Sequence, residues 1–379
     1  MQHAKHWILI AGFMVLLWLP TADYFLHFDP TPRLEEKREP AVWPGWPQNR
    51  EDIEAFPAAY DAYFKDHFGL RERLVLTYLN TKTWVFRSSP IDWGTIGKDG
   101  WLFLSGVSNV DTYRVHSPLT EADLEHRLAD YQSQRAACLK QSALHLVVWG
   151  PNKSTIYPEY LPGWMTRLHD RTNLDALQEY VTQRSDIEMV DLRPALLRGK
   201  QDTRVYYRAE SHWNTLGAYI AYRTILEHIG DRVPGIQVLT KDDVTFELRP
   251  RNQADTILPF AIPAYQAEWV EGATIKNPRS RFLGREIEGL DLKRDVDLLE
   301  YVSGDGLTGP TLLMFHDSFG YPMMPFLVET FARCVFVRRP SFNERIIEAV
   351  KPDVVIDLQV ERKLLSGENL ERYPGLGSW

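Results

Sequence analysis

The C-terminal third of the chain alternates short apolar runs with segments of helical spacing. The apolar runs at 311–315, 334–338 and 353–358 predict buried strands, and the segments at 321–332 and 342–350 predict helices. Short strands that alternate with helices are typical of a parallel sheet with crossover connections. The pattern therefore predicts an α/β fold with helices flanking a parallel sheet.

The same alternation extends upstream. Helices are predicted at 121–140, at 172–184 and directly after Asn214, and strands at 144–149 and 187–192. These elements have the lengths expected for one continued α/β domain.

Three further segments have patterns of their own. Residues 55–86 carry apolar side chains at helical spacing, and Lys98-Asp99-Gly100 lies between apolar runs, which predicts a hairpin turn. Residues 231–305 are polar and irregular with some strand character, and we interpret them as an insertion in the domain.

The N-terminus is apolar. Residues 7–22 carry no charge and lie between Lys5 and Asp23. This is short for a spanning helix of about 20 residues and long for the core of a signal peptide, about 7–15 residues. Pro20 makes a poor cleavage site, so we predict an uncleaved signal anchor at 1–28, with a cleaved signal peptide as the alternative.

The organisation predicted from these patterns has three parts. The anchor is followed by a linker at 29–50, rich in proline and mixed charge, and by one domain at 51–379 that includes the insertion. The rest of the chain would then lie on the far side of the membrane.

Composition excludes several classes of function. The net charge is −8 and no long basic run occurs, which argues against a nucleic-acid partner. The two cysteines, Cys138 and Cys334, form neither a disulfide framework nor a metal-binding spacing, and whether they pair stays open. The eleven histidines have no H-x-H or H-E-x-x-H spacing, so we predict no metal and no cofactor.

One serine is placed for chemistry. Ser318 follows the apolar run at 311–315 and precedes a predicted helix, at the carboxyl end of a strand where α/β proteins collect ligands. His212, ahead of another helix, is the candidate base, and Glu210 is the candidate group to orient it. The alternative is structural, because a serine before a helix is often only a cap and such a histidine is often only hydrogen-bonded.

Two more candidates follow the strand at 144–149. Asn152 can donate a hydrogen bond to an oxyanion, and Lys153 can hold the loop or touch substrate. The alternative for Asn152 is an amide that caps its own turn.

Several motifs together resemble one known family. The segments GKDGWLFL, PNK…YPEYLP, ESHWN…GAY, HDSF and YFKDHFGLRERLV resemble the alginate O-acetyltransferase family of the AlgJ/AlgX type, over about residues 35–365. The resemblance implies an SGNH-hydrolase-like domain, with Ser318 as nucleophile, His212 as base and the position of Glu210 as the acid. Two positions depart from the family pattern, because Glu210 replaces Asp and His316 replaces the Gly of G-D-S-F. Asp317 matches that pattern, and we interpret it as a turn or cap residue more than as the triad acid, with a contact to the oxyanion or the substrate as a further possible role.

The resemblance also implies a function and a compartment. It implies a periplasmic enzyme, anchored in the inner membrane, that places acetyl groups on an exported polysaccharide and receives them through a membrane-bound O-acyltransferase partner. Two alternatives stay open, an SGNH-type carbohydrate esterase that uses water as acceptor and a non-catalytic glycan-binding scaffold of an export complex.

Overall fold

The computed structural model describes residues 2–33, 39–86, 88–89, 94–251, 268–284, 287, 297–303, 309–338 and 342–365. These residues form two compact units, the first ending at residue 89 and the second beginning at residue 94. The predicted divisions at residues 28 and 50 stay predictions, and parts of the predicted linker and insertion lie outside the described residues.

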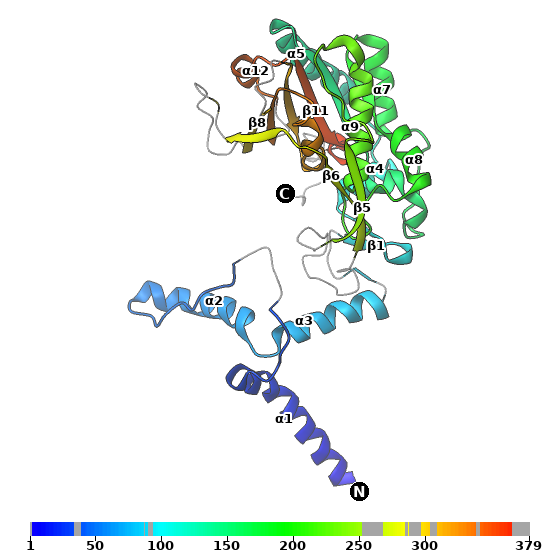
Figure 1. Cartoon of the computed structure of the whole chain (residues 1–379). Coiled ribbons are helices and arrows are strands. Elements are labelled where there is room, and N and C mark those ends of the chain that lie inside the picture. Colours follow the sequence, from blue (N-terminus) through cyan, green and yellow to red (C-terminus); the bar gives the residue numbers. More distant parts are fainter. Residues whose placement is uncertain are drawn as a thin grey trace. The chain divides into compact units, whose positions relative to one another are not determined.

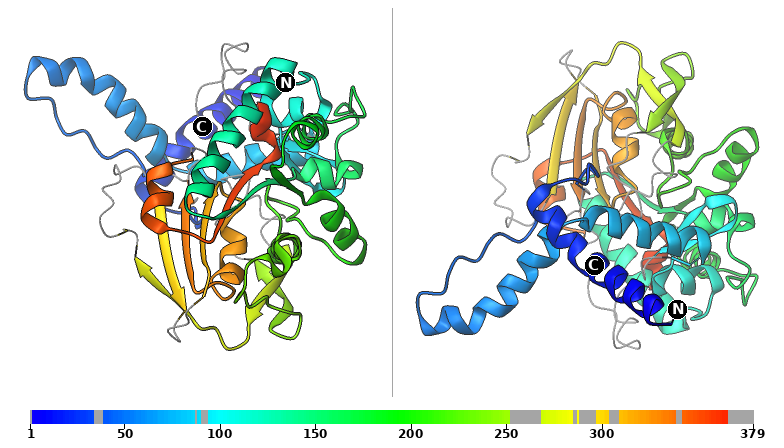
Figure 2. Two further views of the ribbon diagram at one scale, coloured as in Figure 1. Left: turned by 90° about the horizontal axis from the view of Figure 1, so that it is seen from above. Right: turned by 90° about the horizontal axis from the view of Figure 1, so that it is seen from below.

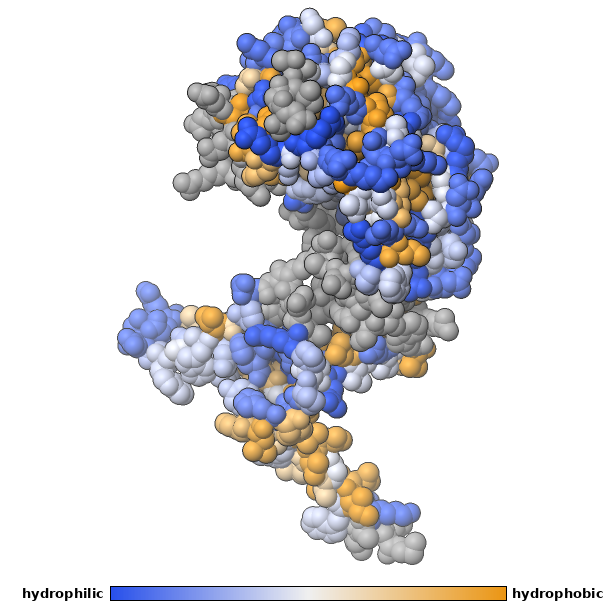
Figure 3. Space-filling model, in the orientation of Figure 1, coloured by the Kyte–Doolittle hydropathy of each residue, from blue (hydrophilic) through white to orange (hydrophobic). Residues whose placement is uncertain are grey.

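The first unit is helical (Figure 1). It consists of α1 (Gln2–Leu26), α2 (Arg50–His67) and α3 (Arg71–Asn80), which a π-helical turn continues over Thr81–Val85. Within α1, Lys5–Leu26 is long and apolar enough to cross a membrane. The apolar side chains along this helix are exposed, as Figure 3 shows.

The second unit is built on a seven-stranded sheet. The strands, in spatial order, are β4 (Glu188–Asp191), β3 (Leu144–Gly150), β11 (Val354–Val360), β9 (Thr311–His316), β10 (Arg333–Arg338), β8 (Asp297–Ser303) and β7 (Ser280–Gly284). The first five run parallel, while β8 and β7 continue the sheet antiparallel. The α/β fold is confirmed. The sheet is mixed and not purely parallel, because β8 and β7, which lie in the predicted insertion, add to it in the antiparallel direction.

Helices cover both faces of this sheet, and Figure 2 shows them flanking the strands. On one face lie α5 (Glu121–Lys140), α7 (Asn173–Arg184) and α12 (Glu344–Val350). On the other lie α8 (Arg193–Asp202) and α9 (Thr215–Ile229), which bury Tyr222 and Ile225 in the larger core. Capping boxes at Thr120 and Thr172 explain why α5 and α7 begin where the sequence predicts.

The second unit contains further, mostly short elements. They are β1 (Gly94–Ile96), β2 (Leu102–Leu104), α4 (Val107–Arg114), α6 (Lys153–Ile156), β5 (Val244–Arg251), β6 (Glu268–Ile275), α11 (Met324–Leu327) and the 3₁₀ turns Lys98–Gly100, Pro158–Tyr160, Gly230–Arg232, Tyr321–Met323 and Glu361–Leu365. The predicted hairpin at residues 98–100 is confirmed, since β1 pairs antiparallel with β2.

One predicted helix is wrong in extent. Instead of a continuous helix over 321–332, the chain forms a 3₁₀ turn over Tyr321–Met323 and then the short α11, which ends at Leu327. Pro325 has no N–H to bond the Tyr321 carbonyl, which a continuous helix would need, whereas Pro322 lies in the first turn, where proline is tolerated. Ser318 therefore does not precede a long helix.

Candidate active site

Three neighbouring parallel strands end at the candidate site. β3, β11 and β9 lie side by side, and their carboxyl ends lead to Asn152, Glu361 and Ser318. Side chains that follow adjacent parallel strands share one edge of the sheet, which is where α/β proteins bind ligands. The topology therefore brings together residues as distant in the sequence as Asn152 and Glu361.

His212 lies between Ser318 and Glu210. Its Nε2 is 2.7 Å from Ser318 Oγ, and its Nδ1 is hydrogen-bonded to Glu210 Oε1. Because a carboxylate only accepts, Nδ1 carries the proton and the Nε2 of the neutral ring accepts from the Ser318 hydroxyl. Glu210 is buried, while His212 and Ser318 are half-buried. The glutamate side chain thus reaches the far side of the imidazole.

A narrow loop carries Glu210 and His212. Tyr206 and Trp213 form a β-bridge across its base, and the Tyr206 hydroxyl donates 2.6 Å to the carbonyl of Pro151 at the end of β3. Asn214 then caps α9 by accepting from the Gly217 N–H. The helix cap and the bridge fix the short segment between them against the sheet edge.

Lys153 fastens this loop. Its buried ammonium donates to the backbone carbonyls of Tyr207 at 3.1 Å, Arg208 at 3.0 Å and Glu210 at 2.7 Å. It also lies over the rings of Trp101 and Phe103. These contacts are the ones expected for the first of the two roles considered for Lys153, holding the loop.

Glu268 on β6 makes a second set of contacts that hold the loop carrying Glu210 and His212. Its carboxylate accepts from the Arg208 N–H at 2.6 Å and pairs with Arg204 at 3.1 Å. Sequence reasoning missed Glu268, which has no local signal and reaches the loop only through the β5–β6 pairing.

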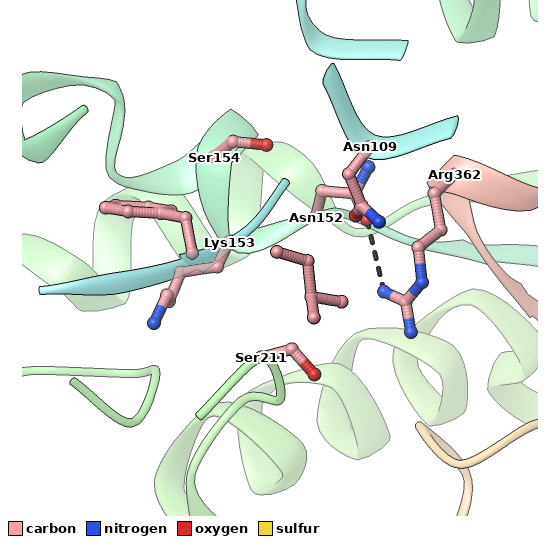
Figure 4. A pocket seen from close by; sticks show the side chains of 8 residues that line it. Asn109, Asn152, Lys153, Ser154, Ser211 and Arg362 are labelled. Atoms are coloured by element: carbon pink, nitrogen blue, oxygen red, sulfur yellow. Dashed lines mark hydrogen bonds between the residues drawn. The ribbon is translucent and has the colours of Figure 1, made fainter. Parts of the chain in front are cut away.

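Asn152 is buried beside a pocket. Its N–H donates to Glu361 Oε2 at 2.9 Å and its Oδ1 accepts from Arg362 at 3.3 Å, while its Nδ2 has no partner among the described residues. The side chain does not cap α6, so the alternative of a turn cap is not what the structure has. Figure 4 shows the Asn152–Arg362 bond on one side of the pocket and the Lys153 ammonium pointing the other way. The pocket is lined by Phe103, Leu104, Asn109, Asn152, Lys153, Ser154, Ser211 and Arg362.

Asp317 and His316 shape the turn around the serine. Asp317 accepts from the N–H groups of Phe319 at 2.9 Å and Val360 at 2.8 Å, which ties the turn to the end of β11. His316, buried, donates from Nδ1 to the Asp317 carbonyl at 2.6 Å. A Cβ on Gly320 would lie 2.6 Å from the His316 ring, so the glycine makes the room that this histidine needs.

Burial raises the pKa values of two carboxylic acids near the site. It raises the pKa of Glu361, whose carboxylate accepts from Thr155 and from the Asn152 N–H. On β11, burial raises the pKa of Asp357 to about 6, and the negative charge of Asp317 acts in the same direction.

Comparison with known proteins identifies this part of the chain. Residues 95–278 match the family described as ALGX, an SGNH hydrolase-like domain of the acetyltransferase AlgX. Over this span the chain is similar to an SGNH hydrolase-like acetyltransferase domain of the AlgX type. The resemblance inferred from the short motifs is thereby confirmed, and the match includes Glu210 and His212 but ends before Ser318.

Known proteins similar to this chain include one curated relative and two solved structures. A probable alginate O-acetylase AlgJ of Pseudomonas syringae pv. tomato is 29% identical over 146 residues, which are 37% of this chain and 34% of that protein. The chain thus spans about a third of the length of this relative. Among solved structures, PatB1 of Bacillus cereus with a sulfonyl adduct has a TM-score of 0.52 at 15% identity, over 73% of this chain and 97% of that one. The O-acetyltransferase domain of Pseudomonas putida AlgJ has a TM-score of 0.48 at 17% identity, over 74% and 95%.

Proposed function

We propose that this chain is an O-acetyltransferase that carries the acetyl group on Ser318 and passes it to a hydroxyl of an exported polysaccharide. The observation that carries the proposal is the His212 imidazole, hydrogen-bonded to Ser318 on one side and to Glu210 on the other. It stands in a domain that is similar to an SGNH hydrolase-like acetyltransferase domain of the AlgX type.

In the first step Ser318 becomes acetylated. As Ser318 Oγ attacks the acetyl carbonyl, its proton moves to His212 Nε2, because a serine hydroxyl is a weak nucleophile until a base takes its proton. Glu210 holds the ring in the reactive tautomer and stabilises the imidazolium that forms. The imidazolium then gives its proton to the leaving group of the donor, which leaves an acetyl ester on Ser318.

Asn152 is the proposed donor to the oxyanion. The negative charge on the carbonyl oxygen needs a fixed hydrogen-bond donor, and the Nδ2 of Asn152 is buried without a partner among the described residues. Its Oδ1 is held by Arg362, which turns the amide so that the amino group is free to donate.

In the second step the polysaccharide takes the acetyl group. His212 removes the proton of a sugar hydroxyl, whose oxygen attacks the acetyl-Ser318 ester, and Ser318 recovers its proton from the histidine as it leaves. Water at the same position would give an esterase with the same three residues, so the acceptor decides between transferase and esterase.

The polysaccharide and the partner are proposed from the family. The relative from Pseudomonas syringae is named as an alginate O-acetylase, so we propose an alginate-like exopolysaccharide as the acceptor. We also propose that α1 anchors the chain in the inner membrane with the second unit in the periplasm. A membrane-bound O-acyltransferase would supply the acetyl group there.

A partition experiment tests the transferase. The full-length protein in detergent is given an activated acetyl ester with or without mannuronate oligomers, and released acetate and acetylated sugar are measured together. We expect the sugar to divert most of the acetyl flux from acetate, and Ser318→Ala to abolish both products. Acetate release that the sugar leaves unchanged would make the protein an esterase.

A further inference from the structure

The first unit carries a groove whose walls are mainly aromatic. Its volume is ≈ 460 Å³, within the usual range of roughly 300–1,000 Å³ for small-ligand sites. It is lined by Pro20, Thr21, Tyr24, Phe25, Trp43, Trp46, Phe56, Tyr60, Tyr63, Phe64, His67, Phe68 and Gly69. The proposed acetyl transfer uses none of these residues.

Five of these rings form a ladder along one side of α2. The rings of Trp46, Phe56, Tyr60, Phe64 and Phe68 stack in sequence, with centroid separations of 6.2, 5.8, 6.3 and 5.9 Å. The last four are spaced four residues apart, so they lie on one face of the helix. We call these five residues the aromatic ladder.

Three of the five ladder side chains, Trp46, Tyr60 and Phe64, are exposed, and the other two are half-buried. Trp46 is 77% and Phe64 is 53% accessible. Exposing so much apolar surface to water is unfavourable in free energy, so such a patch usually marks an interaction site. Exposed charged side chains, Glu54, Asp61 and Lys65, border the ladder on one flank of α2. A helix whose exposed aromatic face is bordered by charged side chains is suited to lying at a membrane surface.

Charge argues against a polysaccharide in this groove. No Lys or Arg is among its lining residues, and His67 already bonds the Tyr63 carbonyl through Nδ1. A groove for an anionic sugar polymer would need cations to pair with its carboxylates. The lining fits an uncharged apolar chain instead.

The groove is fixed to the end of the apolar helix α1. The buried Asp23 carboxylate accepts from the Leu70 N–H at 2.7 Å and the Asp29 N–H at 2.8 Å, which ties the α2–α3 junction to α1. At Gly69 a Cβ would lie 2.1 Å from the Pro20 carbonyl oxygen, so α1 and this junction are in direct contact. Tyr24 and Phe25 of α1 form part of the groove wall.

The position of the groove along α1 indicates its surroundings. The apolar segment Lys5–Leu26 has 22 residues, or about 33 Å of helix, against about 30 Å of bilayer hydrocarbon. With this segment across a bilayer, Tyr24 and Phe25 lie at the membrane–water boundary, where aromatic side chains are enriched. We propose that the groove and the aromatic ladder bind phospholipid acyl chains at this boundary, so that α2 lies on the membrane beside the anchor.

Neighbouring positions on α2 offer a matched test in the full-length protein. The two native thiols are buried, so single cysteines at Phe64→Cys (ladder side) and Lys65→Cys (polar side) can be labelled selectively with a fluorophore. Ile53→Cys and Glu54→Cys repeat the comparison with every ring of the ladder in place. Leu16→Cys in α1 reports whether the anchor is inserted.

The measurement is quenching by lipid brominated on its acyl chains, in phosphatidylcholine vesicles that contain no other protein. We expect quenching at positions 64 and 53 to be about threefold or more stronger than at 65 and 54, and comparable with position 16. Equal quenching within either pair, with position 16 quenched, would overturn the proposal and leave a protein partner as the occupant. An unquenched label at position 16 would overturn it as well, because the groove would then have no membrane beside it. Neither result depends on acetyl transfer, so the proposed function is tested separately.

Discussion

The Lys153 ammonium donates 2.7 Å to the backbone carbonyl of Glu210, which is itself hydrogen-bonded to His212. Lys153 follows directly after Asn152, so one short segment at the end of β3 carries both the proposed oxyanion donor and the clamp on the loop of the acid and the base. We infer that Lys153 is a positioning residue, which acts through the loop and not on the substrate.

Replacing Lys153 by methionine should therefore slow catalysis without removing the chemistry. Lys153→Met leaves three carbonyls without their ammonium and loosens Glu210, and we expect kcat for acetyl-ester turnover to fall about 10- to 100-fold, with KM nearly unchanged. Lys200→Met is the matched control, because Lys200 also donates to a backbone carbonyl, that of Ile156, and lies over Tyr157. Equal losses in the two variants would contradict a specific role for Lys153.

The His316–Gly320 contact predicts a compensating pair of substitutions. Gly320→Ala forces a Cβ against the His316 ring, and we expect it to lower the free energy of unfolding by about 1–3 kcal/mol. In a His316→Gly background, which restores the family's glycine, the same alanine should cost much less. Gly163→Ala is the control, since a Cβ at Gly163 would meet nothing within 4 Å. Chemical denaturation of the four variants measures the coupling, and additive costs would contradict it.

Much of this architecture was predictable from local pattern. Continuous apolar runs such as 144–149 and 353–358 form strands because each is short and bounded by turns, and Ser318 and Asn152 were found because they follow such runs. The same reasoning applied to the run at 353–358 would have found Glu361 and Arg362.

Other features depended on distant parts of the chain. Helical spacing over 321–332 masked Pro325, which interrupts the helix, and β8 joins the sheet only through pairing with β10. Glu268 reaches the active-site loop through a strand pairing that no local pattern reveals. Long-range pairing is thus the part of the fold and of the site that the sequence alone did not reveal.

Asp357 should make stability depend on pH. Its folded pKa of about 6 lies above the ordinary aspartate value of 3.8, so the folded state holds the proton more tightly and the unfolding free energy falls as pH rises between about 4 and 6. Asp357→Asn mimics the protonated acid. We expect it to match the wild type near pH 4 and to be more stable by about 3 kcal/mol at pH 7. Urea denaturation across this range checks it, and a difference that does not change with pH would contradict it.

We expect Asn152 to stabilise the oxyanion of the transition state by donating a hydrogen bond from its side-chain amide. We expect Asn152→Ala to lower kcat by about 100-fold with little change in KM, as for the loss of one oxyanion donor. Asn152→Asp keeps the size but removes the N–H donor, and should be at least as slow. Pre-steady-state acetylation of Ser318 measures the step concerned, and wild-type rates in both variants would exclude Asn152 from the oxyanion site.

The central claim is that Ser318 carries the acetyl group with His212 as its base. The most direct measurement is mass spectrometry of the full-length protein, quenched in acid after exposure to an activated acetyl ester, alongside His212→Ala and Glu210→Ala. We predict a single acetyl group on Ser318 in the wild type, none in His212→Ala and slowed labelling in Glu210→Ala. A folded wild-type protein that acquires no acetyl group on Ser318, or a His212→Ala variant that acquires it at the same rate, would contradict the mechanism.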